Sequence, residues 1–568
     1  MSTHLSNLLL GLGMGAVIAA LGLGVVITHR ASNVINFAHA AIGTYLALVY
    51  YEFRATGDIV QPFLIPLVPA RFHLLDRPTD ATAMITVLVL AAGVGALCYY
   101  LIFRPLRHAP PLARVVASLG LMVYLIGVMG LRFPTEGAAG LVFDGPLPRQ
   151  VVEFAGIRSF ADRYWLALIV IVGALALAAL SRFTNFGLAT TASAENESGA
   201  VLQGISSDRV GVLNWMLAAM LAAVAMILAA PITPLSASTS PLLIVPALGA
   251  ALVGQFRSIM ATVATGFAIG MVQSELLALQ SDWEWLPNVG LHDAIPFLLV
   301  LIALVWRADG AIGRGEIVTS GLPPAAEPRA TIPATLLVLA AAAAGLFLLD
   351  SQWRLAIMLS AIAAIMTLSV IVLTGFVGQI SLATFALAGT AAFAMVRATE
   401  DLSLPFPLAP ALGVAVAVAI GTLAGLPAMR IRGLTLAIAS LAAAVAVEEL
   451  LFEWEWFTGG LGGSSVEPAT LGPLDFDIQA TGDAYPREAF GFLALLTLLA
   501  AMIIVVNLRR SRTGWQWLAV RANERAAEAL GISARRVKLS ANAMAAALAG
   551  VGGTLIAYQA QFISKDSF

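Results

Sequence analysis

Long runs without a charged side chain alternate with short polar segments along the chain. No Asp, Glu, Lys or Arg precedes Arg30. Because an α-helix needs about 20 residues to cross a bilayer, this pattern predicts an all-α polytopic membrane protein with roughly 14–16 membrane-embedded segments. Some segments are expected to be re-entrant, since several runs are short or interrupted by Gly and Pro. The charge-free runs cover residues 31–51, 81–103, 115–131, 164–181, 211–256, 258–274, 294–306, 355–396, 402–429, 489–508 and 539–564.

Composition supports placing the chain in a membrane. Of its 568 residues, 60% are hydrophobic and 11% are charged, whereas soluble domains carry about 25% charged residues. A net charge of −2 gives no reason to expect nucleic acid as a partner. The single cysteine, Cys98, excludes an internal disulfide and a Cys-based zinc site. The N-terminus lacks a cleavage signal and is interpreted as a retained first helix.

Basic residues gather in three short loops, which the positive-inside rule places in the cytoplasm. The acidic segments 282–293 and 448–488 then lie on the opposite face, and the N-terminus lies outside. The first loop holds Arg104, Arg107 and Arg114, and the second holds Arg430 and Arg432. The third loop contains Arg509, Arg510, Arg512, Arg521, Arg525, Arg535, Arg536 and Lys538.

One segment recurs at an offset of 327 residues. GLATTASAENESGAVLQGISSDRV, from Gly187, aligns with GWQWLAVRANERAAEALGISARRV, from Gly514. Both copies are expected in the cytoplasm, so the two halves have the same topology. This predicts two tandem parallel repeats, related by an axis along the membrane normal.

A polar stretch, residues 307–330, separates the two halves. It is rich in Gly, Pro, Ala and charged residues and has the composition of a flexible cytoplasmic linker. The sequence therefore predicts a first domain at 1–306 and a second at 331–568. The second half stops at Phe568, opposite Pro241 of the first, so it is expected to be truncated at its C-terminus.

The repeated segment has the composition of a short amphipathic helix, over 194–203 and again over 521–530. A glycine is expected to end each copy in the left-handed conformation. An interfacial helix that only orients the bundle is one interpretation. Recurrence with the same spacing favours docking of a partner instead, through Asn196, Glu197, Gly204 and Arg209 and through Asn523, Glu524, Gly531 and Arg536.

These residues support a family resemblance. The first half resembles the H-type permease subunit of branched-chain amino-acid ABC transporters (LivH), through VINFAHAAIGTY (34–45) and the segment ending GISSDRV. The second half resembles the M-type subunit (LivM), through LTGFVGQISLATFALAGTAAF (373–393), RIRGLTLAIASLA (430–442), FTGGLGG (457–463) and RANERAAEALGISARRVKL (521–539). The resemblance implies two permease subunits fused in one chain of the bacterial cell inner membrane. It also implies that the repeated segment is the coupling helix that docks an ATPase subunit.

The sequence departs from the family pattern at a few positions. Ala40 and Ala41 follow NFAH, where the H-type pattern usually has Gly-Glu. GQFRS (254–258) replaces a Gly-Gly-x-Gly-Ser stretch and introduces Phe256 and Arg257. Thr384 stands where the M-type pattern usually has a larger polar residue. These departures bear on the substrate and on transport competence more than on the fold.

No energy-coupling site is visible in the chain. Its two lysines follow Val537 and Ser564, so no Gly-Lys pair and no Walker A loop exist, and any ATPase must be a separate subunit. We expect no cofactor, no metal and no enzymatic activity. An ion-coupled secondary transporter is an alternative, but the apolar runs carry few acids. Glu275, Glu448, Glu449, Glu453 and Glu455 are interpreted as interfacial.

The substrate path is expected at two polar stretches. Asn33, Asn36 and His39 recur at i, i+3 and i+6, which would place them along one face of an apolar helix. Such a face lines a cavity or bonds to neighbouring helices. The matching stretch of the second half contains Gly375, Gly378, Gln379, Ser381 and Thr384, whose glycines are expected to break a helix.

The functional hypothesis is a permease component of an ATP-binding cassette importer for branched-chain or other hydrophobic amino acids. Its expected partners are ATPase subunits, a periplasmic solute-binding protein and the lipid bilayer. Urea and short amides remain alternative substrates. The sequence leaves open whether the two halves pair within one chain or between chains.

Overall fold

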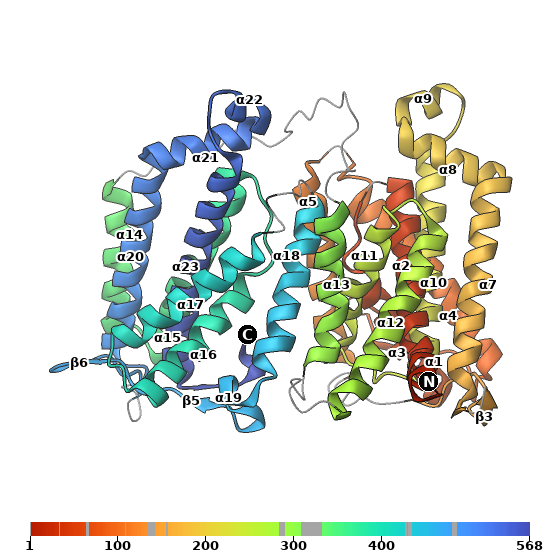
Figure 1. Cartoon of the computed structure of the whole chain (residues 1–568), viewed down its shortest axis with the longest axis horizontal. Coiled ribbons are helices and arrows are strands. Elements are labelled where there is room, and N and C mark those ends of the chain that lie inside the picture. The colour runs from red at the N-terminus through yellow and green to blue at the C-terminus, as the bar shows by residue number, and fades with distance from the viewer. Residues whose placement is uncertain are drawn as a thin grey trace. The chain divides into compact units, whose positions relative to one another are not determined.

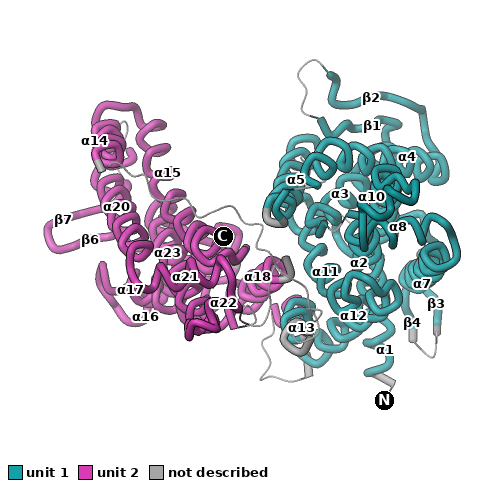
Figure 2. Tube along the Cα trace, turned by 90° about the horizontal axis from the view of Figure 1, so that it is seen from above, with its two compact units in different colours: residues 1–288, 295–303 teal, residues 289–294, 304–568 magenta. Residues whose placement is uncertain are grey.

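The computed structural model of the chain describes residues 2–32, 34–63, 68–107, 109–133, 143–154, 157–282, 290–307, 332–426, 429, 434–479 and 485–568. It divides into two compact units (Figure 2). Unit 1 contains residues 1–288 and 295–303, and unit 2 contains residues 289–294 and 304–568. The predicted linker beyond Arg307 and the basic residues Arg430 and Arg432 lie outside the described residues.

Unit 1 is built around α2 (Leu12–Ser32), which contacts α7, α10, α11 and α12. Side chains on every face of α2 are buried, among them Val17, Leu21 and Val25. Two short hairpins, β1 (Asp58–Val60) with β2 (Arg71–His73) and β3 (Val151–Phe154) with β4 (Ile157–Phe160), connect helices. The other helices are α1 (Ser2–Leu10), α3 (His39–Thr56), α4 (Asp80–Cys98), η1 (Tyr99–Phe103), α5 (Pro111–Arg132), α7 (Ala161–Phe183), α8 (Asn185–Glu195), α9 (Glu197–Leu202), α10 (Ser207–Ala229), η2 (Ser240–Leu243), α11 (Ile244–Val253), α12 (Ile259–Asp282) and α13 (Leu291–Arg307).

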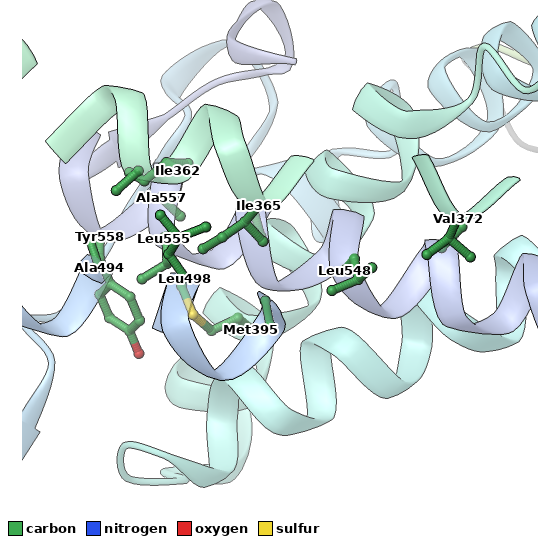
Figure 3. Close-up of a cluster of buried hydrophobic side chains, with 14 of the residues drawn as sticks. Ile362, Ile365, Val372, Met395, Ala494, Leu498, Leu548, Leu555, Ala557 and Tyr558 are labelled. Carbon is green, nitrogen blue, oxygen red and sulfur yellow. The ribbon is translucent and has the colours of Figure 1, made fainter. Parts of the chain in front are cut away.

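Unit 2 is built around α23 (Ala534–Ala560), which contacts α15, α16 and α17. Its core joins α15, α16, α20 and α23 through side chains such as Ile365, Met395, Leu498 and Leu555 (Figure 3). The C-terminal strand β8 (Phe562–Ile563) pairs with β5 (Ser464–Ser465). The remaining elements are α14 (Ile332–Leu348), α15 (Ser351–Val370), η4 (Ile371–Val377), α16 (Thr384–Leu402), α17 (Leu408–Ala424), α18 (Leu434–Val447), η6 (Glu448–Phe452), α19 (Glu455–Thr458), η7 (Gly460–Gly462), β6 (Thr470–Leu471), β7 (Leu474–Asp475), α20 (Glu488–Arg510), α21 (Arg512–Ala522), α22 (Glu524–Ala529) and η9 (Lys565–Ser567).

The described residues contain nine helices that are long and apolar enough to span a bilayer, and four shorter apolar helices. Some of these helices turn large apolar side chains outward. On α20, for example, Leu496 is 65% exposed and Ile503 and Ile504 are each 51% exposed. Such faces are unfavourable in water but suit contact with lipid tails. The prediction of an all-α polytopic membrane protein is therefore confirmed.

One close helix contact in unit 1 joins α2 to α12 through glycines. A Cβ atom built on Gly270 would lie 2.2 Å from the backbone nitrogen of Gly15, and one built on Gly15 would lie 2.9 Å from Cα of Phe267. Small residues let membrane helices approach until their backbones touch. The position of α2 in unit 1 therefore depends on the absence of side chains at this crossing.

We expect Gly270→Val to separate α2 from α12, because overpacking of a close helix contact costs about 1–3 kcal/mol. The thermal midpoint of the detergent-solubilised protein should fall by several degrees. Gly173→Val is the matched control, since a Cβ atom on Gly173 of α7 meets no described atom within 4 Å. Equal thermal midpoints for the two variants would contradict this packing.

Candidate functional site

The repeated sequence folds into the same four-helix series in both units. The helices α20, α21, α22 and α23 each begin 327 residues after α7, α8, α9 and α10. We call α8 with α9 the first elbow, and α21 with α22 the second elbow. In its own unit, each elbow lies beyond the ends of the long helices that flank it (Figure 1). The two halves therefore share local structure as well as sequence.

The elbows differ from the single amphipathic helix that the sequence predicts over 194–203 and 521–530. Each segment is broken at an asparagine, which caps the helix that follows. Asn196 Oδ1 accepts from the backbone nitrogen of Gly199 at 2.9 Å, and Asn523 Oδ1 accepts from Ala526 at 3.1 Å. An asparagine cap competes with helix continuation, which explains why composition alone misplaced the boundary.

The same capping groups recur at the other ends of each elbow. Thr184 and Ser511 accept from the nitrogens of Gly187 and Gly514. Ser206 and Ser533 accept from the backbone nitrogens of Arg209 and Arg536, whose side chains are exposed. Gly204 and Gly531 have φ angles of 79° and 82°, the left-handed conformation that the sequence predicts for these glycines.

Ion pairs fix the first elbow to the first basic loop. Glu197 pairs with Arg107 Nη1 at 2.8 Å. Asp208 pairs with Arg107 Nη2 at 2.8 Å and with Arg104 at 3.0 Å. Burial disfavours the charge on Arg107, but Tyr99, Glu197 and Asp208 outweigh it and hold the pKa of this guanidinium above its usual value. The loop and the elbow thus lie at the same end of unit 1, as the charge pattern predicts.

The second elbow is fixed by a different and more buried pair. Glu524 pairs with Lys538 Nζ at 2.9 Å, and their side chains are 17% and 5% exposed. The two glutamates predicted to dock a partner therefore contact their own unit. The apolar tips face outward instead, with Leu202 86% exposed and Leu530 81% exposed. No sequence pattern distinguished these leucines from the membrane-facing ones.

The first predicted polar stretch lies at a helix break. Asn33 is outside the described residues, and α2 ends at Ser32 while α3 begins at His39. The expected single helical face is therefore wrong for Asn36 and His39. Asn36 Oδ1 instead accepts from the backbone nitrogen of Ala38 at 3.1 Å, an Asx turn that leads into α3.

The second predicted polar stretch also lies at a helix break, between η4 and α16. The π-helix η4 ends at Val377, Gly378 follows with a φ of 75°, and α16 begins at Thr384. Ser381 Oγ accepts from the backbone nitrogen of Ala383 at 3.4 Å. The polar side chain two residues before each cap position, Asn36 or Ser381, thus makes the same turn in both halves. Gly375 lies within η4.

The two breaks differ in what occupies them. His39 is 1% exposed, and a Cβ atom on Gly24 would lie 2.0 Å from its Nε2 atom. The imidazole therefore lies directly against the backbone of α2, and Nε2 has no hydrogen-bond partner within the described chain. At the second break, Gln379, Ser381 and Thr384 line a pocket.

Helices remote in sequence complete this pocket. Three polar lining residues were not predicted, namely Ser369 of α15, Ser440 of α18 and Asn542 of α23. Each is a single small polar residue in an Ala-rich or apolar helix. Such a residue gives little indication in the sequence that it lines a pocket. Among the described residues, no His, Cys, Asp and Glu side chains form a group that could hold a metal ion.

Of the departures from the family pattern, Thr384 lines the pocket at the second break, and three of those in the first half are buried. Ala40 and Ala41 are fully buried in α3. Phe256 is 6% exposed, and its ring centroid lies 4.7 Å from that of His29. Gln255 and Phe256 have positive φ angles of 55° and 53°, and Arg257 is exposed. The loop thus keeps a backbone that favours glycine although its side chains differ.

Loss of the Lys538 partner should loosen the second elbow. Removing one member of a buried ion pair costs about 3 kcal/mol, so we expect trypsin to cleave Lys538→Met faster than wild type between residues 509 and 536. The double variant Lys538→Met/Glu524→Gln should recover most of the resistance. Glu197→Gln is the control, because its pair is 30–37% exposed and contributes about 1 kcal/mol or less. If trypsin cleaved Lys538→Met no faster than wild type, the Glu524–Lys538 ion pair would not be what fixes the second elbow.

Comparison with known proteins agrees with this architecture. The family described as "Branched-chain amino acid transport system / permease component" matches residues 7–304 and 352–568. Each matched segment contains one helix break and one elbow.

Both kinds of permease occur among the relatives. The high-affinity branched-chain amino acid transport system permease protein LivM of Escherichia coli K12 is 37% identical over 168 residues, which cover 27% of this chain and 40% of LivM. LivH of the same organism is 26% identical over 315 residues, covering 54% of this chain and 94% of LivH. A probable LivH of Methanocaldococcus jannaschii is 27% identical over 269 residues, covering 45% of this chain and 76% of that protein.

The predicted resemblance to both LivH and LivM is thus confirmed. The chain spans about two fifths of the LivM length and nearly the whole LivH length. Since the family matches most of the sequence in two consecutive segments, the chain belongs to the permease family of branched-chain amino acid transport systems.

Proposed function

We propose that this chain is the membrane permease of an ATP-driven importer for branched-chain amino acids in a bacterial inner membrane. A LivH-like domain at 1–306 and a LivM-like domain at 331–568 are joined by the linker at 307–330. The observation that carries the proposal is that each family segment holds its own break and elbow. The relatives are named for this transport, and none of them favours urea, short amides or ion coupling.

The elbows are the proposed docking sites for two separate ATPase subunits. A chain without a Walker A loop cannot bind ATP in that way. Each elbow is fixed to its unit by capped helix ends and an ion pair, and each exposes a leucine at its tip. Because each elbow is held rigidly, a movement of an ATPase subunit bound at its exposed leucine would be transmitted to the long helices of the unit. The chain itself has no proposed enzymatic activity.

The two helix breaks are the proposed substrate path. Interrupted helices leave backbone groups free to contact solute, and membrane proteins tolerate them where they line a cavity. Asn36, His39, Gln379, Ser381 and Thr384 carry no fixed charge. Uncharged groups of this kind bind a zwitterion weakly, which suits a path whose selectivity comes from an external solute-binding protein.

We expect the chain, reconstituted in vesicles with its ATPase subunits and binding protein, to take up leucine only when ATP is hydrolysed. A protonophore should leave the uptake unchanged, since no ion gradient supplies the energy. A Walker-lysine variant of the ATPase subunit is the control and should abolish uptake. Leucine uptake without an ATPase, driven by an ion gradient, would contradict the proposal, and uptake of urea but not leucine would contradict the substrate.

The elbow tips allow a separate test. We expect Leu202→Glu combined with Leu530→Glu to lower co-purification of the ATPase subunits at least tenfold, because a carboxylate replaces an apolar contact. Leu471→Glu is the matched control, as this leucine is 45% exposed in the β6 strand, which lies at the other end of unit 2 from the second elbow (Figure 1). Unchanged co-purification of the double variant would show that the tips do not dock the ATPase.

A further inference from the structure

The pocket at the second break is lined by both uncharged polar and apolar side chains. The polar ones are Ser369, Gln379, Ser381, Thr384, Ser440 and Asn542. Leu373, Leu387 and Leu436 are among the apolar ones. This combination matches a small ligand with a polar end and an aliphatic end.

Gln379 supplies an unused donor in this pocket. The side chain is 7% exposed, and Nε2 has no hydrogen-bond partner within the described part of the chain. A buried N–H group without an acceptor costs about 1–3 kcal/mol. The backbone nitrogen of Gln379 bonds to the carbonyl of Leu373 at 3.0 Å, which holds the residue in place. A ligand oxygen would satisfy the amide.

The N-terminus of α16 supplies further donors to the pocket. Thr384 and Leu387, both in its first turn, line the pocket. Ala383 at the cap position offers no side-chain acceptor, so the first N–H groups of this 19-residue helix have no side-chain cap. A helix N-terminus and a primary amide together attract an anionic oxygen ligand.

Asn542 supplies an acceptor to the same pocket. Asn542 donates through Nδ2 to the carbonyl of Lys538 at 3.2 Å, which leaves its Oδ1 atom as an acceptor. Gly425 of α17 lets this amide come close, since a Cβ atom there would lie 2.9 Å from Nδ2. An ammonium group can bond to neutral oxygens of this kind without a buried carboxylate.

We propose that this pocket binds the amino acid itself, with the carboxylate at Gln379 Nε2 and the N-terminus of α16 and the aliphatic side chain against Leu373, Leu387 and Leu436. The inference rests on the proposed function, because it names the contact site of that substrate. It also makes the halves unequal. At the first break His39 begins α3, where Thr384 begins α16, and its imidazole fills the space beside Gly24.

Cysteine protection tests the site without transport. Ser440→Cys is made in a Cys98→Ser background of the full chain, and its reaction with a small methanethiosulfonate is timed with leucine or leucinol present. We expect leucine to slow the reaction, and leucinol, which lacks the carboxylate, to need at least about tenfold higher concentration. Thr190→Cys is the control, because Thr190 lines a separate cavity beside the first elbow and should show no protection.

Adding Gln379→Met should remove leucine protection while leaving the unliganded reaction rate unchanged, which shows that the pocket remains folded. Equal protection by leucine and leucinol, protection that survives Gln379→Met, or no reaction without ligand would each overturn the inference. Absent protection with normal leucine uptake would reject this site and leave the proposed function intact. Protection by urea but not leucine would reject the proposed substrate.

Discussion

The structure depends on one constraint, which is that an interrupted helix in a bilayer must still satisfy its backbone hydrogen bonds. An unpaired N–H or C=O group in hydrocarbon costs several kcal/mol. At each break one short polar side chain satisfies one of these groups: Asn36 Oδ1 accepts from the backbone nitrogen of Ala38, and Ser381 Oγ accepts from that of Ala383. At the second break the carbonyl of Leu373 and the hydroxyl of Ser440 accept from the backbone nitrogens of Gln379 and Leu382. In the elbows, Asn196 and Asn523 cap the helices that follow them.

The two halves repeat the same capping bonds in their elbows, so their backbones fold alike there. The side chains around these bonds differ, so the ion pairs and the groups at the two breaks differ as well. Glu197 reaches the loop residue Arg107, whereas Glu524 reaches Lys538 within the helix that follows it. A large imidazole occupies the first break and a pocket opens at the second. A fused chain permits this divergence, since each half occurs once and can specialise.

The sequence predicted what depends on composition and local spacing. The polytopic helical class, the repeat at 327 residues and the left-handed glycines follow from hydropathy, alignment and Gly chemistry. The helix breaks were less visible. Asn33, Asn36 and His39 fit a helical spacing, and only the structure shows that α2 ends before them. At Asn196 an asparagine cap, which competes with helix continuation, marks the boundary that composition missed.

Tertiary partners were beyond reach of the sequence. The Glu197–Arg107 pair joins residues 90 positions apart. Asn542 and Gln379 line one pocket to which α15, η4, α16, α17, α18 and α23 all contribute. The sequence predicts that Glu197 and Glu524 dock a partner, and the structure adds that each is ion-paired within its own unit. The exposed leucines next to them gave no separate signal in a chain where apolar residues predominate.

The central claim is that the second break, and not the first, holds the solute. Its most direct test is a high-resolution cryo-electron microscopy map of the complete chain in lipid nanodiscs with saturating leucine. The account predicts leucine density beside Gln379 and the first turn of α16, with the carboxylate toward both, and an unchanged His39 ring against Gly24. Leucine density at the first break, with the pocket at Gln379 empty, would contradict it.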